Sequence, residues 1–256
     1  MNDKRVQVHI PYEILVARLA EVLEEGLCPE VYLDAESLST LEEGTLTGMG
    51  KALADSGLST TIHGPYMDMS PGGADEGVRS LTAEKFSLLI NRTIPLKPEV
   101  ITLHAGYDER YFDGDSQLWL AQSIKTWTLL AKEAEEAGVV LALENIFETR
   151  PDTLKDLVEA VGSPNLRVCI DSGHLNLYSE VSTEEWFSEL GPYIALLHIH
   201  DNLGVRDDHL PVGDGEIDFP EFFSLVREYA NGPVYTIEPH GEEVLWRGLE
   251  AIGKYL

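Results

Sequence analysis

The segments VVLALEN (Val139 to Asn145) and VYTIE (Val234 to Glu238) point to the class of the fold. Both are largely apolar at consecutive positions instead of alternating with polar residues, and each carries a glutamate at or near its end. A short run of this kind is typical of a parallel strand that is buried on both faces of its sheet. Parallel neighbours must be joined by long crossovers, which are usually helices. The two segments therefore predict an α/β protein.

Similar short runs recur about eight times, and longer stretches with helical periodicity separate them. The predicted strands are Arg5–Ile10, Glu30–Leu33, Ser59–His63, Glu99–His104, Val139–Asn145, Leu166–Asp171, Ile194–His200 and Val234–Glu238. The clearest predicted helices are Glu13–Glu25, Thr82–Arg92, Gln117–Ala137, Thr153–Val161, Glu184–Leu190, Phe219–Ala230 and Glu242–Tyr255. Eight strand–helix units in 256 residues predict a (β/α)8 TIM barrel, a fold that typically needs about 250 residues.

An open, doubly wound sheet is the alternative architecture. It fits less well, because the segment HIPYE (His9 to Glu13) stands where a Gly-rich phosphate loop would follow the first strand. No Gly/Ser-rich linker, low-complexity tract or shift in charge marks a domain boundary. Residues 1–256 are therefore expected to form a single barrel domain.

The chain is strongly acidic, with 45 acidic and 18 basic residues and a net charge of −27. A field of this sign repels phosphate backbones and favours cations, so nucleic acid is not expected as a partner. No apolar run reaches the roughly 18 residues that a membrane-spanning helix needs. The N-terminal segment reaches Pro11 and Glu13 too soon for the apolar core of a signal peptide. These features predict a cytoplasmic protein without a membrane span.

Metal-capable side chains close six successive predicted strands, from the third to the eighth. They are His63, His104, Glu144, Asp171, His198 with His200, and Glu238. In a barrel all strands run the same way, so these ends meet at one mouth, where the catalytic residues of TIM barrels lie. Each residue alone has an ordinary explanation, and Asp171 could simply cap the following helix. Burying a strand-end carboxylate unpaired is costly, however, so the six ends together predict a shared site.

The composition of this set favours a divalent cation. The central candidates are three carboxylates and one imidazole: Glu144, Asp171, Glu238 and His198. Such a set suits Mn, Zn, Co, Mg or Fe, and without a cation its carboxylates would repel one another. His63 and His104 could extend the site to a second metal. His174, Asp207 and His209 could form a third metal position or bind substrate, and the sequence leaves both open.

The motifs around these residues resemble the xylose-isomerase-like barrel superfamily. In chain order they are IHGPY, LHAG, LEN, CIDSGHL, LHIHD, DDHLPVGDG and TIEP, and they extend from about Ile62 to Glu238. The superfamily contains sugar isomerases and epimerases, hydroxypyruvate isomerases and apurinic endonuclease IV enzymes. The motifs are specific for the superfamily and much less specific for the substrate.

The resemblance implies a role for individual residues. The central four look like the superfamily's shared single-metal site, with His198 preferred to His200 because the ligand tends to lie in an HxxD arrangement, here with Asp201. His200 lies on the same strand face and could still take part. His174 looks like the substrate-contacting histidine of the isomerases, or like a zinc ligand of the endonucleases.

The activity that the resemblance favours is a metal-dependent isomerase or epimerase of a small keto sugar or sugar phosphate. The metal would stabilise an enediolate, and Glu144 and Glu238 would act as the acid/base pair. His174, His209 and Arg206 could grip hydroxyls or a phosphate, and Arg206 could equally be a surface partner of neighbouring aspartates. The sequence leaves the identity and number of metals, the sugar and the oligomeric state open, and an oligomer is compatible with it.

An endonuclease IV-like zinc phosphodiesterase acting on abasic DNA is the alternative activity. All nine metal-ligand positions of that pattern are filled, by His63, His104, Glu144, Asp171, His174, His198, Asp207, His209 and Glu238. Tyr66, three residues after His63, also matches. Four departures weigh against this reading. The endonuclease motif HPGS is HAGY in this chain, ENTAGQG is ENIFETR, and CIDTCH is CIDSGH. The segment after the second strand, which contacts DNA in the endonucleases, is the acidic DAESLSTLEEG here. The departures and the net charge favour the sugar enzyme.

Overall fold

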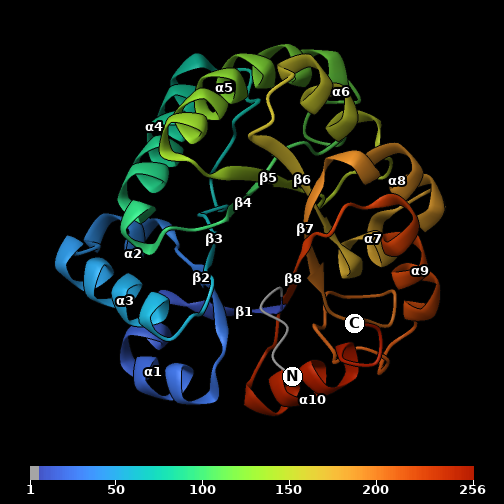
Figure 1. Ribbon diagram of the computed structural model, residues 1–256. Helices are drawn as coiled ribbons and strands as arrows, with labels where there is room; N and C mark the ends of the chain where they lie inside the picture. Colours follow the sequence, from blue (N-terminus) through green and yellow to red (C-terminus); the bar gives the residue numbers. More distant parts are fainter. Residues whose placement is uncertain (1–5) are drawn as a thin grey trace.

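The computed structural model describes residues 6–256, in which eight parallel strands close a barrel in chain order (Figure 1). The strands are β1 Val6–Pro11, β2 Cys28–Tyr32, β3 Thr61–His63, β4 Val100–His104, β5 Val140–Glu144, β6 Leu166–Asp171, β7 Ile194–Ile199 and β8 Val234–Ile237. β8 pairs with β1, with Val6 opposite Tyr235, and this pairing closes the sheet. The predicted TIM barrel is confirmed, and Arg5 of the first predicted strand lies outside the described residues.

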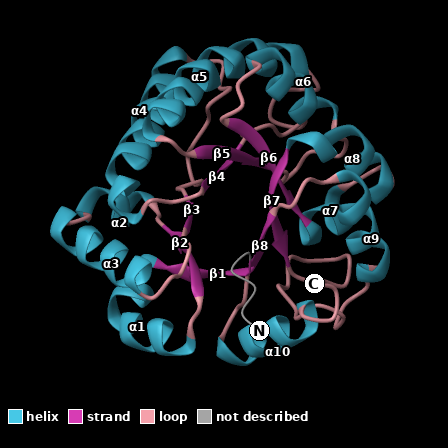
Figure 2. Cartoon of the chain, in the orientation of Figure 1, coloured by secondary structure: helices cyan, strands magenta, loops and turns pink. Residues whose placement is uncertain are grey.

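The helices form a ring around the strands (Figure 2). They are α1 Tyr12–Glu25, α2 Ala35–Thr40, α3 Glu43–Asp55, α4 Glu76–Thr93, α5 Ser116–Ala137, α6 Asp152–Val161, α7 Ser172–Tyr178, α8 Thr183–Leu190, α9 Phe219–Tyr229 and α10 Glu242–Ile252. Two short 3-10 helices, Ile94–Leu96 and Gly191–Tyr193, precede β4 and β7. Within residues 6–256, none of the helices combines the length and apolar character that crossing a bilayer requires.

Side chains on the two faces of the strands pack in different environments. On β5, Leu141 and Leu143 belong to the large core that the strands share with the surrounding helices. The alternate residues form a separate apolar cluster from β4 to β8: Val100, Ala142, Cys169, Leu196 and Val234. Because side chains two residues apart share a face, this inner face continues toward the strand ends as Glu144, Asp171 and His198. The barrel thus turns its metal-capable side chains inward, above a dry apolar layer.

Candidate active site and metal centre

A cavity of about 760 Å³ opens at the C-terminal ends of the strands, where the sequence predicted the site. The metal-capable residues that line it include His63, His104, Glu144 and Glu238. Asp171 and His198 belong to the same cluster, but both are fully buried. The structure therefore brings the six predicted strand ends together at one mouth.

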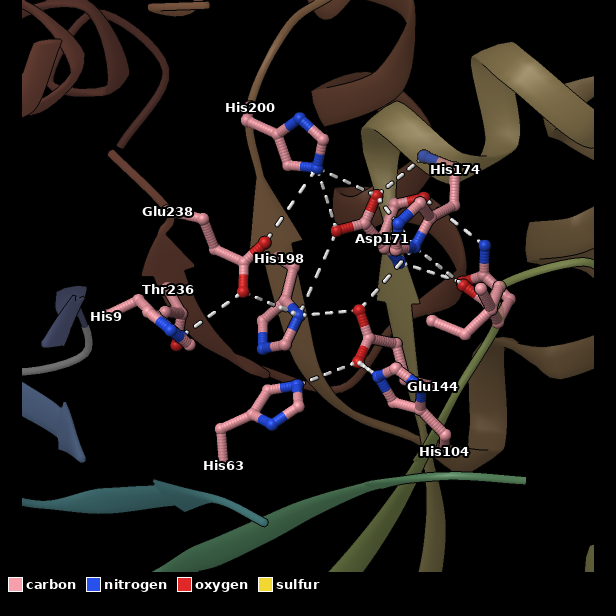
Figure 3. Close-up of polar contacts among 12 residues, drawn as sticks. His9, His63, His104, Glu144, Asp171, His174, His198, His200, Thr236 and Glu238 are labelled. Atoms are coloured by element: carbon pink, nitrogen blue, oxygen red, sulfur yellow. Dashed lines mark hydrogen bonds and ion pairs between the residues drawn. The ribbon is translucent and has the colours of Figure 1, made fainter. Parts of the chain in front are cut away.

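His198 is the centre of this cluster (Figure 3). Its Nδ1 atom lies 2.9 Å from Oε1 of Glu144, 3.4 Å from Oε1 of Glu238 and 3.9 Å from Oδ2 of Asp171. Burial lowers the pKa of His198, but the neighbouring Cys169 thiol and the carboxylates outweigh burial and raise this pKa well above its usual value. Three carboxylates that converge on one imidazole nitrogen form a set of ligands suited to a divalent cation.

The other nitrogen of His198 faces a carboxylate that the sequence analysis missed. Nε2 of His198 lies 3.3 Å from Glu30, which is on β2 and completely buried. Nδ1 of His9 lies 3.2 Å from the same carboxylate, and Thr236 donates a hydrogen bond to it. Burial raises the pKa of Glu30, but His198 and His9 outweigh burial and lower it overall. An ionised Glu30 therefore accepts the Nε2 proton of His198, so a cation that binds this ring would replace the proton on Nδ1.

A second group shares Glu144 with the first. Nε2 of His63 and Nε2 of His104 lie 3.2 and 3.3 Å from Oε2 of Glu144. Nδ1 of His63 donates a hydrogen bond to the carbonyl oxygen of Gly64 at 2.9 Å. Glu144 thus presents one oxygen to His198 and the other to this pair of histidines.

A third group centres on Asp207. Its Oδ2 atom lies 3.1 Å from Nε2 of His209 and 3.4 Å from Nε2 of His174. Nδ1 of His174 donates to the carbonyl oxygen of Asn145, and Nδ1 of His209 donates to that of Glu238, both at 3.0 Å. Burial lowers the pKa of both histidines, but the acidic neighbours outweigh it and raise the pKa of His174 to about 10 and that of His209 to about 9.

These contacts test whether the groups fit a metal. A carbonyl oxygen only accepts, so His63, His174 and His209 each carry their proton on Nδ1. In the neutral ring, Nε2 then holds a lone pair that points at a carboxylate oxygen, which is unfavourable unless a proton or a cation lies between them. Backbone carbonyls that hold Nδ1 of metal-binding histidines are common in metalloproteins. The donor set therefore suits cations in all three groups.

Asp171 both caps a helix and belongs to the cluster of metal-capable residues, the two roles that the sequence left as alternatives. Its Oδ1 atom accepts the backbone N–H of His174 at 2.6 Å and so caps α7. Both of its oxygens also lie 3.0–3.1 Å from Nε2 of His200. His200 is buried, and its ring lies against Gly173 of α7 and contacts Asp171, which is a candidate ligand.

The sequence matches the family model described as xylose isomerase-like TIM barrel over residues 28–254. That range includes every residue of the three groups. The chain belongs to the xylose isomerase-like TIM barrel family. The resemblance drawn from the motifs is thereby confirmed.

Individual relatives of this xylose isomerase-like barrel share less than a third of its residues over the aligned parts. The uncharacterized protein MJ1311 of Methanocaldococcus jannaschii is 29% identical over 202 residues, which are 76% of this chain and 69% of the relative. The crystal structure of a D-tagatose 3-epimerase-like protein has a TM-score of 0.83 at 24% identity and covers 97% of this chain and 96% of that one. A D-psicose 3-epimerase crystallised with D-fructose has a TM-score of 0.76 at 17% identity, over 92% and 86%. At such identities the two structures show a shared fold.

Tyr66 and Arg206, two further candidates from the sequence, lie at different places in this xylose isomerase-like barrel. Tyr66 lines the cavity and stacks on His104, with ring centroids 4.7 Å apart. The side chain of Arg206 is 80% exposed, forms an ion pair with Asp208 and does not line the cavity. The structure therefore places Tyr66 at the site and Arg206 outside it.

Two histidines and one glutamate that line the cavity, His9, His240 and Glu148, were also not singled out from the sequence. His9 on β1 contacts Glu238 as well as Glu30, with Nδ1 3.4 Å from Oε1 of Glu238. His240 stacks on His209 at 4.0 Å. Glu148 is buried, which raises its pKa to about 7. The predicted order of the strands contained a hint for His9, because it lies near the C-terminal end of the first predicted strand.

Proposed function

We propose that the protein is a divalent-metal-dependent isomerase or epimerase of a small keto sugar. The observation that carries this proposal is the convergence of Glu144 and Glu238 on Nδ1 of His198, from strands on either side of β7 in the barrel. The names of the two structural relatives, a D-tagatose 3-epimerase-like protein and a D-psicose 3-epimerase, support the same class of reaction.

Glu144, Asp171, His198 and Glu238 would hold the metal, and Mn, Zn, Co or Mg suits these ligands. When bound, such an ion acts as a Lewis acid that polarises the carbonyl group of the substrate. Glu30 and His200 orient two of the ligands from behind, so the set is preorganised by contacts from β2 and from the residue after β7.

The two glutamates would carry the proton transfers. One removes the proton from the carbon beside the carbonyl, and the other delivers a proton to the opposite face of that carbon or to its neighbour. Burial by itself raises the pKa of Glu144, but His198, His104 and His63 outweigh burial and hold this pKa well below its usual range. Glu144 is therefore ionised at neutral pH, which is the protonation state that a general base requires.

A second candidate function rests on the other two groups. Glu144 joins the His63–His104 pair to the central set, and Asp207 forms a further group with His174 and His209. Several metals held this close together can activate water for phosphodiester cleavage. A nuclease also needs a basic rim for DNA, whereas Arg206 and Arg150 are exposed and paired with acidic residues. The sugar reaction is the better supported of the two.

Solvent exchange tests the proposal. The metal-loaded protein would be incubated in D2O with a panel of ketopentoses and ketohexoses, free and phosphorylated, and deuterium at the carbons beside the carbonyl would be followed by NMR. Removal of either carboxylate, in Glu144→Gln or Glu238→Gln, should slow exchange by about 100-fold or more. Glu136→Gln, at an exposed position of α5, is the matched control and should exchange normally. Cleavage of abasic-site DNA without exchange into any sugar would instead establish the second candidate.

A further inference from the structure

The wall of the cavity differs between its two halves. Next to the loops that follow β7 and β8 it is polar and contains Asp207, His209 and His240. Next to the loops and helices that follow β3 to β6 it carries apolar and aromatic side chains, which we call the aromatic shelf: Tyr66, Val78, Tyr107, Tyr111, Phe147 and Tyr178. Tyr111 is 75% exposed and Phe147 is 39% exposed. Large side chains left this open beside a polar cluster indicate a surface that a ligand covers.

The shelf is supported from below. Tyr107 packs on Trp119 of α5 with ring centroids 5.2 Å apart, and Phe147 packs edge-on against Tyr178 at 5.3 Å. The loop after β3 approaches α5 so closely that a side chain at Gly72 would collide with Trp119 and Ser123. These contacts hold the shelf in place before a ligand arrives, which lowers the entropic cost of binding.

The described wall of the cavity lacks the long cationic side chains that commonly bind a phosphate group. Among the described residues that line it there is no lysine or arginine. TIM barrels often bind phosphate in the loops after the seventh and eighth strands, through backbone N–H groups. Here the N–H groups of Gly213, Gly215 and Ile217 all donate to the buried carboxylate of Asp201. The first turn of α10 carries Glu242 and Glu243, which would repel a phosphate from that helix N-terminus.

The guanidinium group of Arg110 lies near the shelf, and its charge is already paired. Arg110 sits over the ring of Phe147 with its guanidinium carbon 5.6 Å from the ring centroid. Both oxygens of Asp108 accept hydrogen bonds from Arg110, at 3.1 and 3.0 Å. The shelf side of the cavity also carries the carboxyl groups of Glu148 and Asp68. A negatively charged end of a substrate would therefore meet carboxyl groups on this side of the cavity, where no lysine or arginine is among the described lining residues.

We propose that the substrate is an uncharged sugar derivative, with an aromatic or alkyl substituent in the position where related metabolites would carry a phosphate. The keto sugar lies against the three histidine–carboxylate groups, and its substituent packs on the aromatic shelf. This inference rests on the proposed sugar reaction and adds the class of substrate to it. The volume of about 760 Å³ is that of a site for a drug-sized ligand, several times what a single small sugar fills.

Three probes that differ only at the sixth carbon of one ketohexose test the inference. They are D-fructose, D-fructose 6-phosphate and 6-O-benzyl-D-fructose, and their binding to the manganese-loaded protein would be measured by calorimetry. Burial of the benzyl ring should make its affinity about tenfold or more higher than that of D-fructose. The phosphate ester should bind more weakly than D-fructose. Equal affinities for the three, or tightest binding of the phosphate ester, would overturn the inference.

Variants of the shelf show whether the benzyl ring binds where the structure places it. In Phe147→Ala and Tyr111→Ala the ratio of the two affinities, benzyl ether to D-fructose, should fall toward one. Leu129→Ala removes a side chain of comparable exposure on α5 and should keep the wild-type ratio. A wild-type ratio in both shelf variants would contradict the inference. If the benzyl ether binds tightly but no sugar exchanges deuterium, the proposed reaction is wrong and this inference stands. If sugars exchange deuterium but the protein does not prefer the benzyl ether to D-fructose, this inference is wrong and the proposed reaction stands.

Discussion

The carboxylate of Glu30 lies 3.3 Å from Nε2 of His198, and Glu144 lies 2.9 Å from Nδ1 of the same ring. The imidazole is therefore held between two carboxylates, and both of its nitrogens face one. In the proposed metal site, the cation replaces the proton on Nδ1, and the ionised Glu30 keeps the proton on Nε2 and orients the ring.

Replacing Glu30 by glutamine should weaken metal binding. Glutamine can still accept from Nε2 but lacks the negative charge that makes the imidazole a stronger ligand. The loss in metal affinity should be about 10- to 100-fold. Titration with Co²⁺ would measure both the affinity and, through the visible spectrum, the geometry of the site.

Thr102→Val is the control for Glu30→Gln. Thr102 lies in the same barrel, is buried, and its hydroxyl has no hydrogen-bond partner among residues 6–256. The control should leave the Co²⁺ affinity and spectrum unchanged. An unchanged affinity in Glu30→Gln itself would show that His198 does not depend on Glu30 for its orientation.

The glycine of the DSGH segment should resist substitution. A Cβ atom at Gly173 would lie 2.0 Å from Cε1 of His200, whose ring is buried against Asp171. Gly173→Ala should therefore push His200 away, lower the free energy of unfolding by about 1–3 kcal/mol and weaken metal binding. Chemical denaturation and Co²⁺ titration would measure the two effects.

At Gly48, which is also a helical glycine, substitution by alanine should raise the stability instead of lowering it. Gly48 is exposed on α3, and a Cβ atom there meets no atom within 4 Å. Alanine should therefore raise the stability by about 0.5–1 kcal/mol, because glycine disfavours the helical backbone. Equal effects at the two positions would show that the contact with His200 is not what makes Gly173 necessary.

The metal-free protein should become less stable as the pH rises from about 6.5 to 10. The pKa of His174 is raised to about 10 and that of His209 to about 9, from an ordinary value of 6.5 in the unfolded chain. A histidine whose pKa is raised by folding stabilises the folded state fully below its unfolded pKa, and this stabilisation is lost as the pH passes the folded pKa. Thermal unfolding of the chelator-treated protein across this range should show the melting temperature falling by several degrees.

Metal addition is the control for the pH series. The proposed single ion lies in the central group and leaves His174 and His209 protonated on Asp207, so the metal-loaded protein should lose stability with a similar slope over the same range. A much smaller slope with metal would show that His174 and His209 also bind a cation, against the proposed single-metal site.

The strand ends could be predicted because each is local in the sequence. Short apolar runs end in His63, His104, Glu144 and Asp171, and the structure ends the same strands at these residues. The start of the predicted helix Phe219–Ala230 is local as well, because Asp218 accepts the backbone N–H of Glu221 and Pro220 lies in the first turn of α9.

Glu30 escaped prediction because everything that explains it is distant in the chain. Its partners His198 and Thr236 are 168 and 206 residues away, so no local pattern marks its carboxylate as buried. Asp201 was assigned to an HxxD ligand arrangement, whereas the structure uses it to hold the loop up to Ile217 through backbone N–H groups.

Three helices of the structure, α2, α3 and α7, are not among the clearest helices that the sequence predicts, and each has a physical reason. In α3 the glycines Gly44, Gly48 and Gly50 weaken the helical pattern, and the helix is held by the buried side chains Leu46 and Leu53. The other two, α2 and α7, are only 6 and 7 residues long, and each begins at an aspartate that caps it. Short helices of this kind depend on caps and tertiary packing more than on periodicity.

Metal content per chain is the most direct test of the central claim that this barrel binds a divalent metal for sugar chemistry. Elemental analysis would be done on protein purified without chelator and without a nickel column, beside the variant Asp171→Asn. We predict about one Mn, Mg or Co ion per wild-type chain and a clear loss of metal in the variant. Two or three Zn ions per chain together with cleavage of abasic DNA, or no divalent metal even after incubation with these ions, would contradict the account.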